Sequence, residues 1–459
     1  MRLTNKIAQY KAWKEGVKHC TFNPDGPGVV RMHLIPPKFK LLGNPPYILI
    51  LNGYYLLPLG YSWAVLLSSF IDRVNEYDNR EIKDRDMEKI ISDTVKAAHA
   101  IYSVIPSSDI KDDLFDMLDI LFCVAGRENP DVELERLSIR RYAKNMSAPH
   151  RMDLMVSAMT DADGCWHCNQ KCKFCYAAGQ ELSAASELST ERWKDSIDKL
   201  RDAGVPMLTF TGGEPTLRHD IIELIDYSKW FITRLNTNGL MLTEDFCTRL
   251  KEASLDSLQI TFYSAYESIH NSLVGGEHYK TTLAGIKNAI RAGLDVSINT
   301  PLCRKNAEYL DTLKLIKELG VRFVTLSGLI ATGGAKDLAA EYDLTEDELF
   351  SIVKEAKKFC DDNGMEMDFT SPGLISAEKL QSIGVKVPSC GAALSNMAIA
   401  PDGTVIPCQS WLGKGAALGN ILTDSFESIW NAEMAVKLRN MTDEEALNCP
   451  FRGSEAKNG

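Results

Sequence analysis

The sequence is short of several features that mark other classes of protein. Its 51 lysines and arginines are outnumbered by 62 aspartates and glutamates, and the net charge of −11 argues against a nucleic-acid partner. Residues 1–16, MRLTNKIAQYKAWKEG, contain no apolar core followed by small residues, so we expect no secretory signal. Internal repeats and low-complexity tracts are also lacking. These absences leave an ordinary soluble protein whose length suggests two to four domains.

One uncharged stretch, residues 41–71, is long enough to be mistaken for a membrane span. Pro45-Pro46 and Asn52-Gly53 interrupt it, and Asn-Gly between apolar runs is typical of a β-hairpin. We therefore expect a hairpin that turns at Asn52-Gly53, and no membrane association.

Cysteine, in contrast, is plentiful. The chain has 12 cysteines, and without an export signal we expect reduced thiols or metal ligands in a cytoplasmic protein. Four of them lie in GCWHCNQKCKFCYA: Cys165, Cys168, Cys172 and Cys175. Three thiolates could hold a four-iron, four-sulfur cluster and leave one iron open to an exogenous ligand. Four thiolates could instead enclose a structural zinc or a saturated electron-transfer cluster, so the cysteines alone leave both interpretations open.

Between Met152 and about Gly334, apolar or β-branched runs alternate with helical patterns. Six runs have the composition of strands: MDLMVSAM, PMLTFTGG, ITRLNTNG, SLQITFYS, DVSINTPL and VRFVTLSG. Helical segments such as TERWKDSIDKLRDAG and TTLAGIKNAIRAG separate them, and several end at a glycine suited to a left-handed C-cap. Six strand–helix units predict an α/β fold, a partial (β/α)6 TIM-like barrel over residues 150–340 with its chemistry at the carboxyl ends of the strands. The four cysteines directly follow the first strand.

The second predicted strand ends in TFTGGEPTLR. Gly212 and Gly213 let backbone carbonyls approach a ligand without obstruction by a Cβ atom. Together with Glu214 they would form an acceptor-rich pocket suited to an ammonium group, and a tight turn with an incidental acid is the alternative. The next three strands end in the polar runs NTNG, QITFYS and SINTP, which suit a ribose and an amino-acid moiety better than a packed core.

The pair of motifs CNQKCKFC and GGEP resembles the radical S-adenosylmethionine (AdoMet) superfamily, and the resemblance covers the whole middle block. It implies that Cys168, Cys172 and Cys175 hold a [4Fe–4S] cluster, that AdoMet binds the fourth iron, and that reductive cleavage releases a 5′-deoxyadenosyl radical. The further residues it implies are Gly212, Gly213 and Glu214 for the methionine amine, Phe174 for the adenine, and Asn238, Thr261 and Asn299 for the ribose and methionine. An outside reductant, flavodoxin or ferredoxin, would supply the electron. Cys165 becomes an extra thiol without an assigned role.

The third block, residues 341–459, begins with helices and then turns irregular. MAIAPDGTVIPC predicts two short strands around a Pro-Asp-Gly turn. The C-x12-G-x4-C spacing of Cys390, Gly403 and Cys408 resembles the opening of the auxiliary-cluster extensions of this superfamily, the SPASM and twitch domains. Only Cys449 follows, so the resemblance implies one auxiliary cluster on Cys390, Cys408 and Cys449. Three buried cysteines that behave as small hydrophobes are the alternative.

The fourth ligand of this auxiliary cluster stays open. No histidine follows His278, which excludes a C-terminal imidazole. Cys360, a carboxylate, solvent or a substrate thiolate remain, and we hypothesise that the open iron binds a cysteine sulfur of the substrate.

The first block, residues 1–135, is predicted to be a winged-helix-like module. The hairpin PYILILNGYYLLPL is followed by helical patterns near residues 63–75, 87–102 and 110–125. Over residues 28–127 this order resembles the small peptide chaperone of pyrroloquinoline quinone biosynthesis, and such modules capture a leader peptide as an added strand. An enzyme subdomain without a separate role is the alternative.

Together the three blocks predict a maturase that binds the leader of a ribosomally made precursor peptide and abstracts hydrogen from its core. A thioether is the favoured product and a carbon–carbon crosslink the next; epimerisation would need a thiol donor such as Cys303 or Cys247. Two other hypotheses are a radical enzyme for small molecules in cofactor or haem-related synthesis, and a non-enzymatic iron–sulfur or zinc protein that binds peptide or carries electrons.

Overall fold

The computed structural model describes residues 2–22, 30–53, 55–77, 82–126, 139–160, 165–336, 338–413, 415 and 417–450. The chain divides into two compact units, which are described separately. Unit 1 comprises Met1–Ala148 and Arg201–Pro206, and unit 2 comprises Pro149–Leu200 and Met207–Gly459. The three domains proposed from the sequence stay a prediction.

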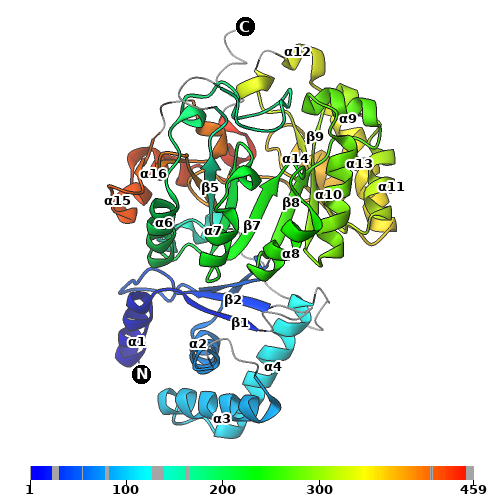
Figure 1. Ribbon diagram of the computed structural model, residues 1–459. Helices are drawn as coiled ribbons and strands as arrows, with labels where there is room; N and C mark the ends of the chain where they lie inside the picture. Colours follow the sequence, from blue (N-terminus) through cyan, green and yellow to red (C-terminus); the bar gives the residue numbers. More distant parts are fainter. Residues whose placement is uncertain are drawn as a thin grey trace. The chain divides into compact units, whose positions relative to one another are not determined.

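Unit 1 combines a small antiparallel sheet with helices (Figure 1). Its four strands pair in chain order: β1 (Lys18–Phe22), β2 (Val30–Ile35), β3 (Tyr47–Leu51) and β4 (Tyr55–Leu59). The helices are α1 (Arg2–Glu15), α2 (Tyr61–Asn75), α3 (Asp84–Ile101), α4 (Ser107–Ala125) and α5 (Ile139–Tyr142). Leu49, Leu67, Phe70 and Leu114 are fully buried in one core that the sheet shares with α2, α3 and α4.

The predicted hairpin forms between β3 and β4. Asn52 and Gly53 both have positive φ angles, 48° and 74°, as a tight hairpin turn requires. Asn52 also bonds to β2, since its N–H donates to Arg31 O (2.9 Å) and its side chain accepts from Arg31 N–H (2.7 Å). The three predicted helices form as α2, α3 and α4, whereas α1, β1 and β2 were not predicted. The winged-helix assignment stays a prediction.

The uncharged stretch is not a membrane helix. Tyr47–Leu51 and Tyr55–Leu59 form β3 and β4, and α2 begins at Tyr61. Within the described ranges, no helix is both long and apolar enough to cross a membrane.

Unit 2 is built on a ten-stranded sheet (Figure 1). Six of its strands pair in parallel and in chain order: β5 (Arg151–Ser157), β6 (Met207–Gly212), β7 (Ile232–Thr237), β8 (Ser257–Thr261), β9 (Val296–Leu302) and β10 (Phe323–Gly328). The intervening helices include α6 (Thr190–Asp202), α7 (Ile221–Tyr227), α8 (Glu244–Glu252), α9 (Glu267–Val274), α10 (Tyr279–Arg291) and α11 (Tyr309–Glu318). These strands coincide with the six predicted runs and confirm the α/β fold with its parallel sheet.

The C-terminal residues extend both edges of this sheet. After α12 (Ala339–Tyr342) and α13 (Glu346–Asp362), strand β11 (Glu366–Phe369) pairs in parallel with β10. After α14 (Ala377–Ser382), strand β12 (Asn396–Ile399) pairs in parallel with β5, and β13 (Thr404–Ile406) and β14 (Gly419–Asn420) follow antiparallel. Helices α15 (Phe426–Trp430) and α16 (Glu433–Arg439) come last. The two predicted short strands are confirmed as β12 and β13, but their union with the barrel sheet was not predicted.

Candidate active site

Three of the four clustered cysteines are brought together beyond the carboxyl end of β5. Burial, together with the neighbouring charges of Glu214 and Cys175, raises the pKa of Cys168 to about 12. Burial also raises the pKa of Cys172, with additional contributions from Cys175 and Cys168. Such thiols would stay protonated unless a metal supplied positive charge, so the donor set fits an iron–sulfur cluster. No three His, Cys, Asp or Glu side chains of the described residues form a site for a single metal ion.

Cys165 does not share this environment. Its side chain is exposed, whereas Cys168, Cys172 and Cys175 are partly buried. Cys165 therefore differs from the other three cysteines in its exposure to solvent.

The cluster loop, residues 168–175, is held by the end of α9. Lys171 N–H donates to Val274 O (3.0 Å) and Lys173 N–H donates to Leu273 O (2.9 Å). Gly275 follows with a φ of 74°, and a Cβ atom there would lie 2.4 Å from Lys171 O. Only glycine allows this approach of the two backbones.

A second glycine contact comes from the loop after β10. Gly334 N–H donates to Cys175 O (2.8 Å), and a Cβ atom on Gly333 would lie 2.4 Å from the same carbonyl oxygen. A Cβ atom on Gly334 would lie 2.6 Å from Lys173 O. Sequence reasoning missed this pair, although ATGGA at a strand end carries the same signal as TFTGG after β6.

The GGE loop, residues 212–214, ends β6 beside β5. Gly212 has a φ of 130°, and a Cβ atom on it would lie 2.3 Å from Ser157 O. A Cβ atom on Gly213 would lie 2.6 Å from Ala158 O, and Gly213 N–H donates to Ser157 O (2.9 Å). The glycines thus serve the approach of β6 to the end of β5, in addition to the ligand access that we predicted from the sequence.

Glu214 is 2% exposed and joins the GGE loop to the end of β7. Its Oε1 accepts from Thr216 N–H (3.1 Å), Thr216 Oγ1 (2.5 Å) and Thr237 Oγ1 (2.7 Å), and its Oε2 accepts from Asn238 N–H (2.8 Å). Burial raises the pKa of Glu214 despite these bonds. Buried carboxylates are normally paired with a cation, and none of the described lysines, arginines or histidines forms an ion pair with Glu214. Its free Oε2 acceptor position fits the ammonium group of a methionine.

Asn238 meets the cluster loop directly. Its Nδ2 donates to Asn169 Oδ1 (2.6 Å) and lies 4.0 Å from Cys168 Sγ. Thr261 and Asn299 are paired in register on β8 and β9 and are partly exposed. No direct bond of their side chains to the cluster loop is present in the described structure, so their assignment to AdoMet stays a prediction.

Phe174 is 9% exposed and packs with Tyr263, Leu273 and Tyr342. Its ring meets that of Tyr342 edge-on, with the centroids 5.2 Å apart. The aromatic contact fixes the side chain predicted to lie beside the adenine.

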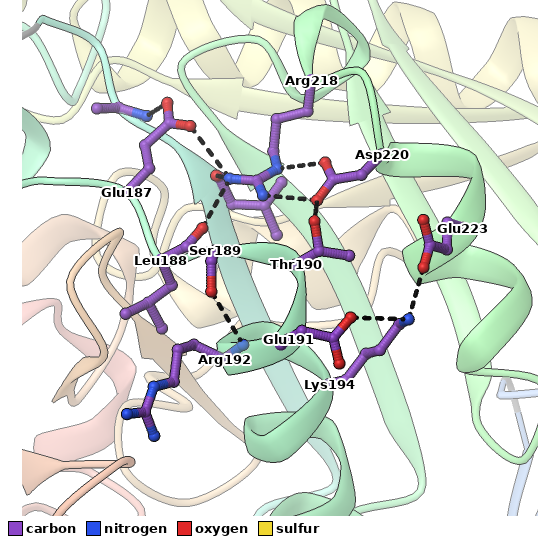
Figure 2. A network of polar contacts seen from close by, with 12 residues as sticks. Glu187, Leu188, Ser189, Thr190, Glu191, Arg192, Lys194, Arg218, Asp220 and Glu223 are labelled. Atoms are coloured by element: carbon purple, nitrogen blue, oxygen red, sulfur yellow. Dashed lines mark hydrogen bonds and ion pairs between the residues drawn. The ribbon is translucent and has the colours of Figure 1, made fainter.

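An arginine network, missed by sequence reasoning, lies next to the GGE loop (Figure 2). Arg218, only 8% exposed, forms a two-pronged ion pair with Asp220 and also bonds to Glu187. Arg218 and Asp220 lie within TLRHD, directly after GGEP, where a charged run is more often a solvated turn. Its partner Glu187 is 31 residues away, so no local pattern could have found the network.

The three C-terminal cysteines also converge. Burial, together with the charges of Cys390 and Cys449, raises the pKa of Cys408 to about 12. Cys390 N–H donates to Ala446 O (2.7 Å). This bond connects Cys390 to the turn that precedes Cys449. This donor set fits a second cluster.

The other cysteines that sequence reasoning considered lie elsewhere. Cys360 is buried in α13 close to Tyr309, and its candidacy as the fourth ligand of the auxiliary cluster stays a prediction. Cys247 is buried in α8 and not at a strand end. Cys303 follows β9 and is buried next to Tyr263 and Cys172.

The auxiliary loop packs on the cluster loop within unit 2. Gln409, next to Cys408, donates through Nε2 to Asp153 Oδ2 on β5 (2.7 Å). Leu412 and Trp411 share one hydrophobic cluster with Cys168 and Cys175. The two groups of cysteines therefore belong to one packed structure.

Family models match both groups. A model described as the radical SAM superfamily matches residues 167–316, and one described as an iron–sulfur cluster-binding SPASM domain matches residues 390–450. The chain contains a radical SAM domain and a SPASM domain. It is therefore a radical SAM enzyme, which cleaves AdoMet reductively, and its cofactors are a [4Fe–4S] cluster, AdoMet and an auxiliary cluster.

Two curated relatives are described as AdoMet-dependent heme synthases. The chain is 29% identical to that of Methanosarcina barkeri over 288 residues, which cover 59% of this chain and 82% of the relative. It is 32% identical to that of Oleidesulfovibrio alaskensis over 184 residues. That match covers 39% of this chain and about half (47%) of the relative.

Solved structures share the fold at low identity. SuiB of Streptococcus suis bound to its precursor peptide SuiA gives a TM-score of 0.59 at 15% identity, covering 86% of this chain and 88% of SuiB. The enzyme anSMEcpe, with AdoMet and the Cp18Cys peptide, gives 0.50 at 17% identity over 66% of this chain and 86% of its own. These likenesses extend the partial-barrel fold of radical SAM enzymes to this radical SAM domain.

Proposed function

We propose that the enzyme is a maturase that modifies a ribosomally made precursor peptide. The observation that carries the proposal is the extent of the likeness to SuiB, which covers 86% of this chain and includes a SPASM domain here. A likeness confined to the catalytic barrel would leave unit 1 without a counterpart. Unit 1 contains a four-stranded antiparallel sheet whose outermost described strands are β1 and β4, and a sheet edge of this kind can accept a leader peptide as an added strand.

The residues of unit 2 take separate roles in this proposal. Cys168, Cys172 and Cys175 hold the cluster, and the carbonyls of the GGE loop with Glu214 receive the methionine amine. When bound, the cluster and AdoMet supply an electron and a 5′-deoxyadenosyl radical that removes a hydrogen atom from the substrate. Cys390, Cys408 and Cys449 would hold the auxiliary cluster, which could bind a substrate thiolate and accept the electron released when that sulfur bonds to the substrate radical. For this reason we favour a thioether as the product.

The electron comes from outside the chain. We propose flavodoxin or ferredoxin as its source and the cytoplasm as the compartment, because thiols and an open iron site require reducing conditions.

A second candidate is a small-molecule reaction in haem-related synthesis. It is favoured by the two curated heme synthases, one of which is matched over 82% of its length. In that case unit 1 would serve a purpose other than leader binding, and no peptide would be consumed.

Co-expression with a small peptide encoded beside the gene tests the first proposal. We expect the peptide to lose two hydrogens for each crosslink, measured as a mass decrease of about 2 Da, and a thioether to resist thiol alkylation. The Cys168→Ala variant should leave the peptide unchanged, because it removes a cluster ligand. Cys165→Ala is the matched control, since its exposed thiol lies outside the group, and it should retain modification.

Three results would contradict this function. One is an unmodified peptide that also fails to bind in calorimetry. Another is conversion of a porphyrin precursor by the same preparation, which would favour the second candidate. The third is loss of modification in Cys165→Ala, which would overturn the assignment of the three cluster ligands.

A further inference from the structure

All three nitrogens of the Arg218 guanidinium group donate hydrogen bonds, and the side chain of Asp220 is the most deeply buried carboxylate among their partners. Its Nε donates to Asp220 Oδ1 (2.8 Å) and its Nη2 to Asp220 Oδ2 (2.7 Å), which makes a bidentate pair (Figure 2). Thr190 Oγ1, at the start of α6, donates to the same Asp220 Oδ2 (2.6 Å). The Arg218 and Asp220 side chains are only 8% and 2% exposed. Buried, bidentate pairs of this kind fix geometry as well as charge.

The third nitrogen reaches the end of β5. Arg218 Nη1 donates to Val156 O (2.9 Å), to Leu188 O (3.2 Å) and to Glu187 Oε2 (3.1 Å). The other oxygen of Glu187, Oε1, accepts from Ala158 N–H (2.8 Å). The network therefore holds β5 on both sides of Ser157.

The backbone of Ser157 contacts both glycines of the GGE loop. Its carbonyl accepts from Gly213 N–H, and it lies where a Cβ atom on Gly212 would collide. A shift of Ser157 would move the loop that carries Glu214, because Gly212 and Gly213 are already in close contact with the backbone of Ser157. The position of the AdoMet-facing loop thus depends on the segment that Arg218 holds.

We propose that Arg218, acting with Glu187 and Asp220, is a positioning residue for AdoMet: it holds Val156–Ala158 in the place that the GGE loop requires. Arg218 itself does not touch AdoMet. This proposal rests on AdoMet binding by the radical SAM domain and does not depend on the peptide substrate. A negative result for Arg218 would therefore not contradict the proposed peptide substrate, and a negative result for the peptide would not contradict the role of Arg218.

Arginine is required because one side chain must donate to five acceptor atoms on four residues. A lysine ammonium can meet one or two of them, and it lacks the planar fork that matches a carboxylate. Leu188, one of the acceptors of Arg218, is also held in place, since its N–H donates to Pro401 O (2.8 Å) in the turn between β12 and β13.

The test is the Arg218→Lys variant of the full-length, cluster-reconstituted enzyme. We expect about tenfold weaker AdoMet binding, comparable to other losses of an outer-shell partner, with unchanged iron content. Affinity is measured by calorimetry and by the change that AdoMet causes in the electron paramagnetic resonance signal of the reduced cluster. Hydrogen exchange should also become faster at the amides of Ala158 and Gly213.

Lys194→Met is the matched control. Lys194 pairs with Glu191 and Glu223 in the same view, but those carboxylates are 80% and 56% exposed and no bond links them to Arg218. Its removal should leave AdoMet affinity and amide exchange at Gly213 unchanged. A drop equal to that of Arg218→Lys would overturn the proposal.

Glu187→Gln provides a second route if Arg218→Lys fails to fold. The amide oxygen can still accept from Ala158 N–H, while the ionic bond to Arg218 is lost, so we expect about threefold weaker AdoMet binding. If the variant that folds binds AdoMet as tightly as the wild type, the network only stabilises the fold and the proposal is wrong, even if the melting temperature is lower.

Discussion

Glu214 is a buried acid that is held in place by hydrogen bonds from neighbouring residues, but no described side chain balances its negative charge. Its four hydrogen bonds come from neutral groups on two loops, and none of the described side chains pairs with it as a cation. Neutral donors orient a carboxylate but leave much of its desolvation cost uncompensated. A methionine ammonium group would supply the missing positive charge. Binding of AdoMet would therefore offset the desolvation free energy of the Glu214 carboxylate, which the folded chain alone leaves uncompensated.

His270 is a buried base in the same unit. Its side chain is fully buried next to the rings of Phe262 (4.8 Å) and Tyr279 (5.8 Å), and Nδ1 accepts from Tyr263 N–H (3.3 Å). Burial, together with the neighbouring His278, lowers the pKa of His270 to about 4. The folded protein therefore keeps this imidazole neutral at pH values where an unfolded chain protonates it.

We predict that stability falls as the pH decreases from 6.5 towards 4. In this window the unfolded chain binds a proton at His270 that the folded chain does not, so unfolding is favoured by up to about 1.4 kcal/mol per pH unit. His270→Asn retains an acceptor near the Nδ1 position but does not titrate, so its stability, lower overall, should depend less on pH. Urea unfolding at pH 5, 6 and 7.5 measures this, and equal pH slopes for both proteins would contradict it.

At the level of the elements, paired glycines carry the contacts between the loops. Gly212-Gly213 brings β6 onto the end of β5, and Gly333-Gly334 brings the loop after β10 onto the cluster loop. In both cases a backbone carbonyl occupies the volume of the missing Cβ atom. The loops at the carboxyl ends of the strands are thus packed backbone to backbone, which leaves few ways for them to shift independently.

Gly333→Ala should therefore weaken the cluster. Its Cβ atom would lie 2.4 Å from Cys175 O, so the loop carrying the third cysteine must move. We expect the reconstituted variant to bind its cluster iron about tenfold more weakly, as is typical when a group that supports a metal ligand is displaced. The readouts are iron content and visible absorbance.

Gly364→Ala separates the collision from backbone strain. Gly364 has a similar positive φ, 64° against 53° for Gly333, but a Cβ atom there would meet nothing within 4 Å. It should be strained to a comparable degree and still hold its iron. Equal iron retention in the two variants would show that contact with the cluster loop has no role.

The sequence was sufficient where a local pattern determines the structure. Period and composition identified β5 to β10, and Asn52-Gly53 identified its hairpin. It failed where distant segments meet: β12 joins β5 across more than 200 residues, and Glu187 reaches Arg218 across 31. Such pairings depend on the folded sheet bringing segments together, which no single segment encodes. Gly333-Gly334 was visible in the sequence, but its partner carbonyls on the cluster loop were not.

At the level of the whole molecule, we propose that unit 1 binds the leader peptide while unit 2 carries the chemistry. All of the clustered cysteines, the GGE loop and the arginine network lie in unit 2, and the SPASM residues share its sheet and one of its hydrophobic clusters. Unit 1 has its own sheet and its own buried core. Each unit thus has the apolar interior that independent folding requires.

We predict that a chain of residues 149–459 retains radical chemistry and loses peptide binding. After reconstitution it should hold both clusters and release 5′-deoxyadenosine from AdoMet under a chemical reductant, while calorimetry with the leader peptide shows no heat of binding. The full chain carrying Cys168→Ala is the reciprocal control, because it should bind the leader with unchanged affinity and release no 5′-deoxyadenosine. Leader binding by residues 149–459 as tight as that of the full chain would mean that unit 1 is not the receptor, since the peptide would then be recognised by the catalytic unit itself.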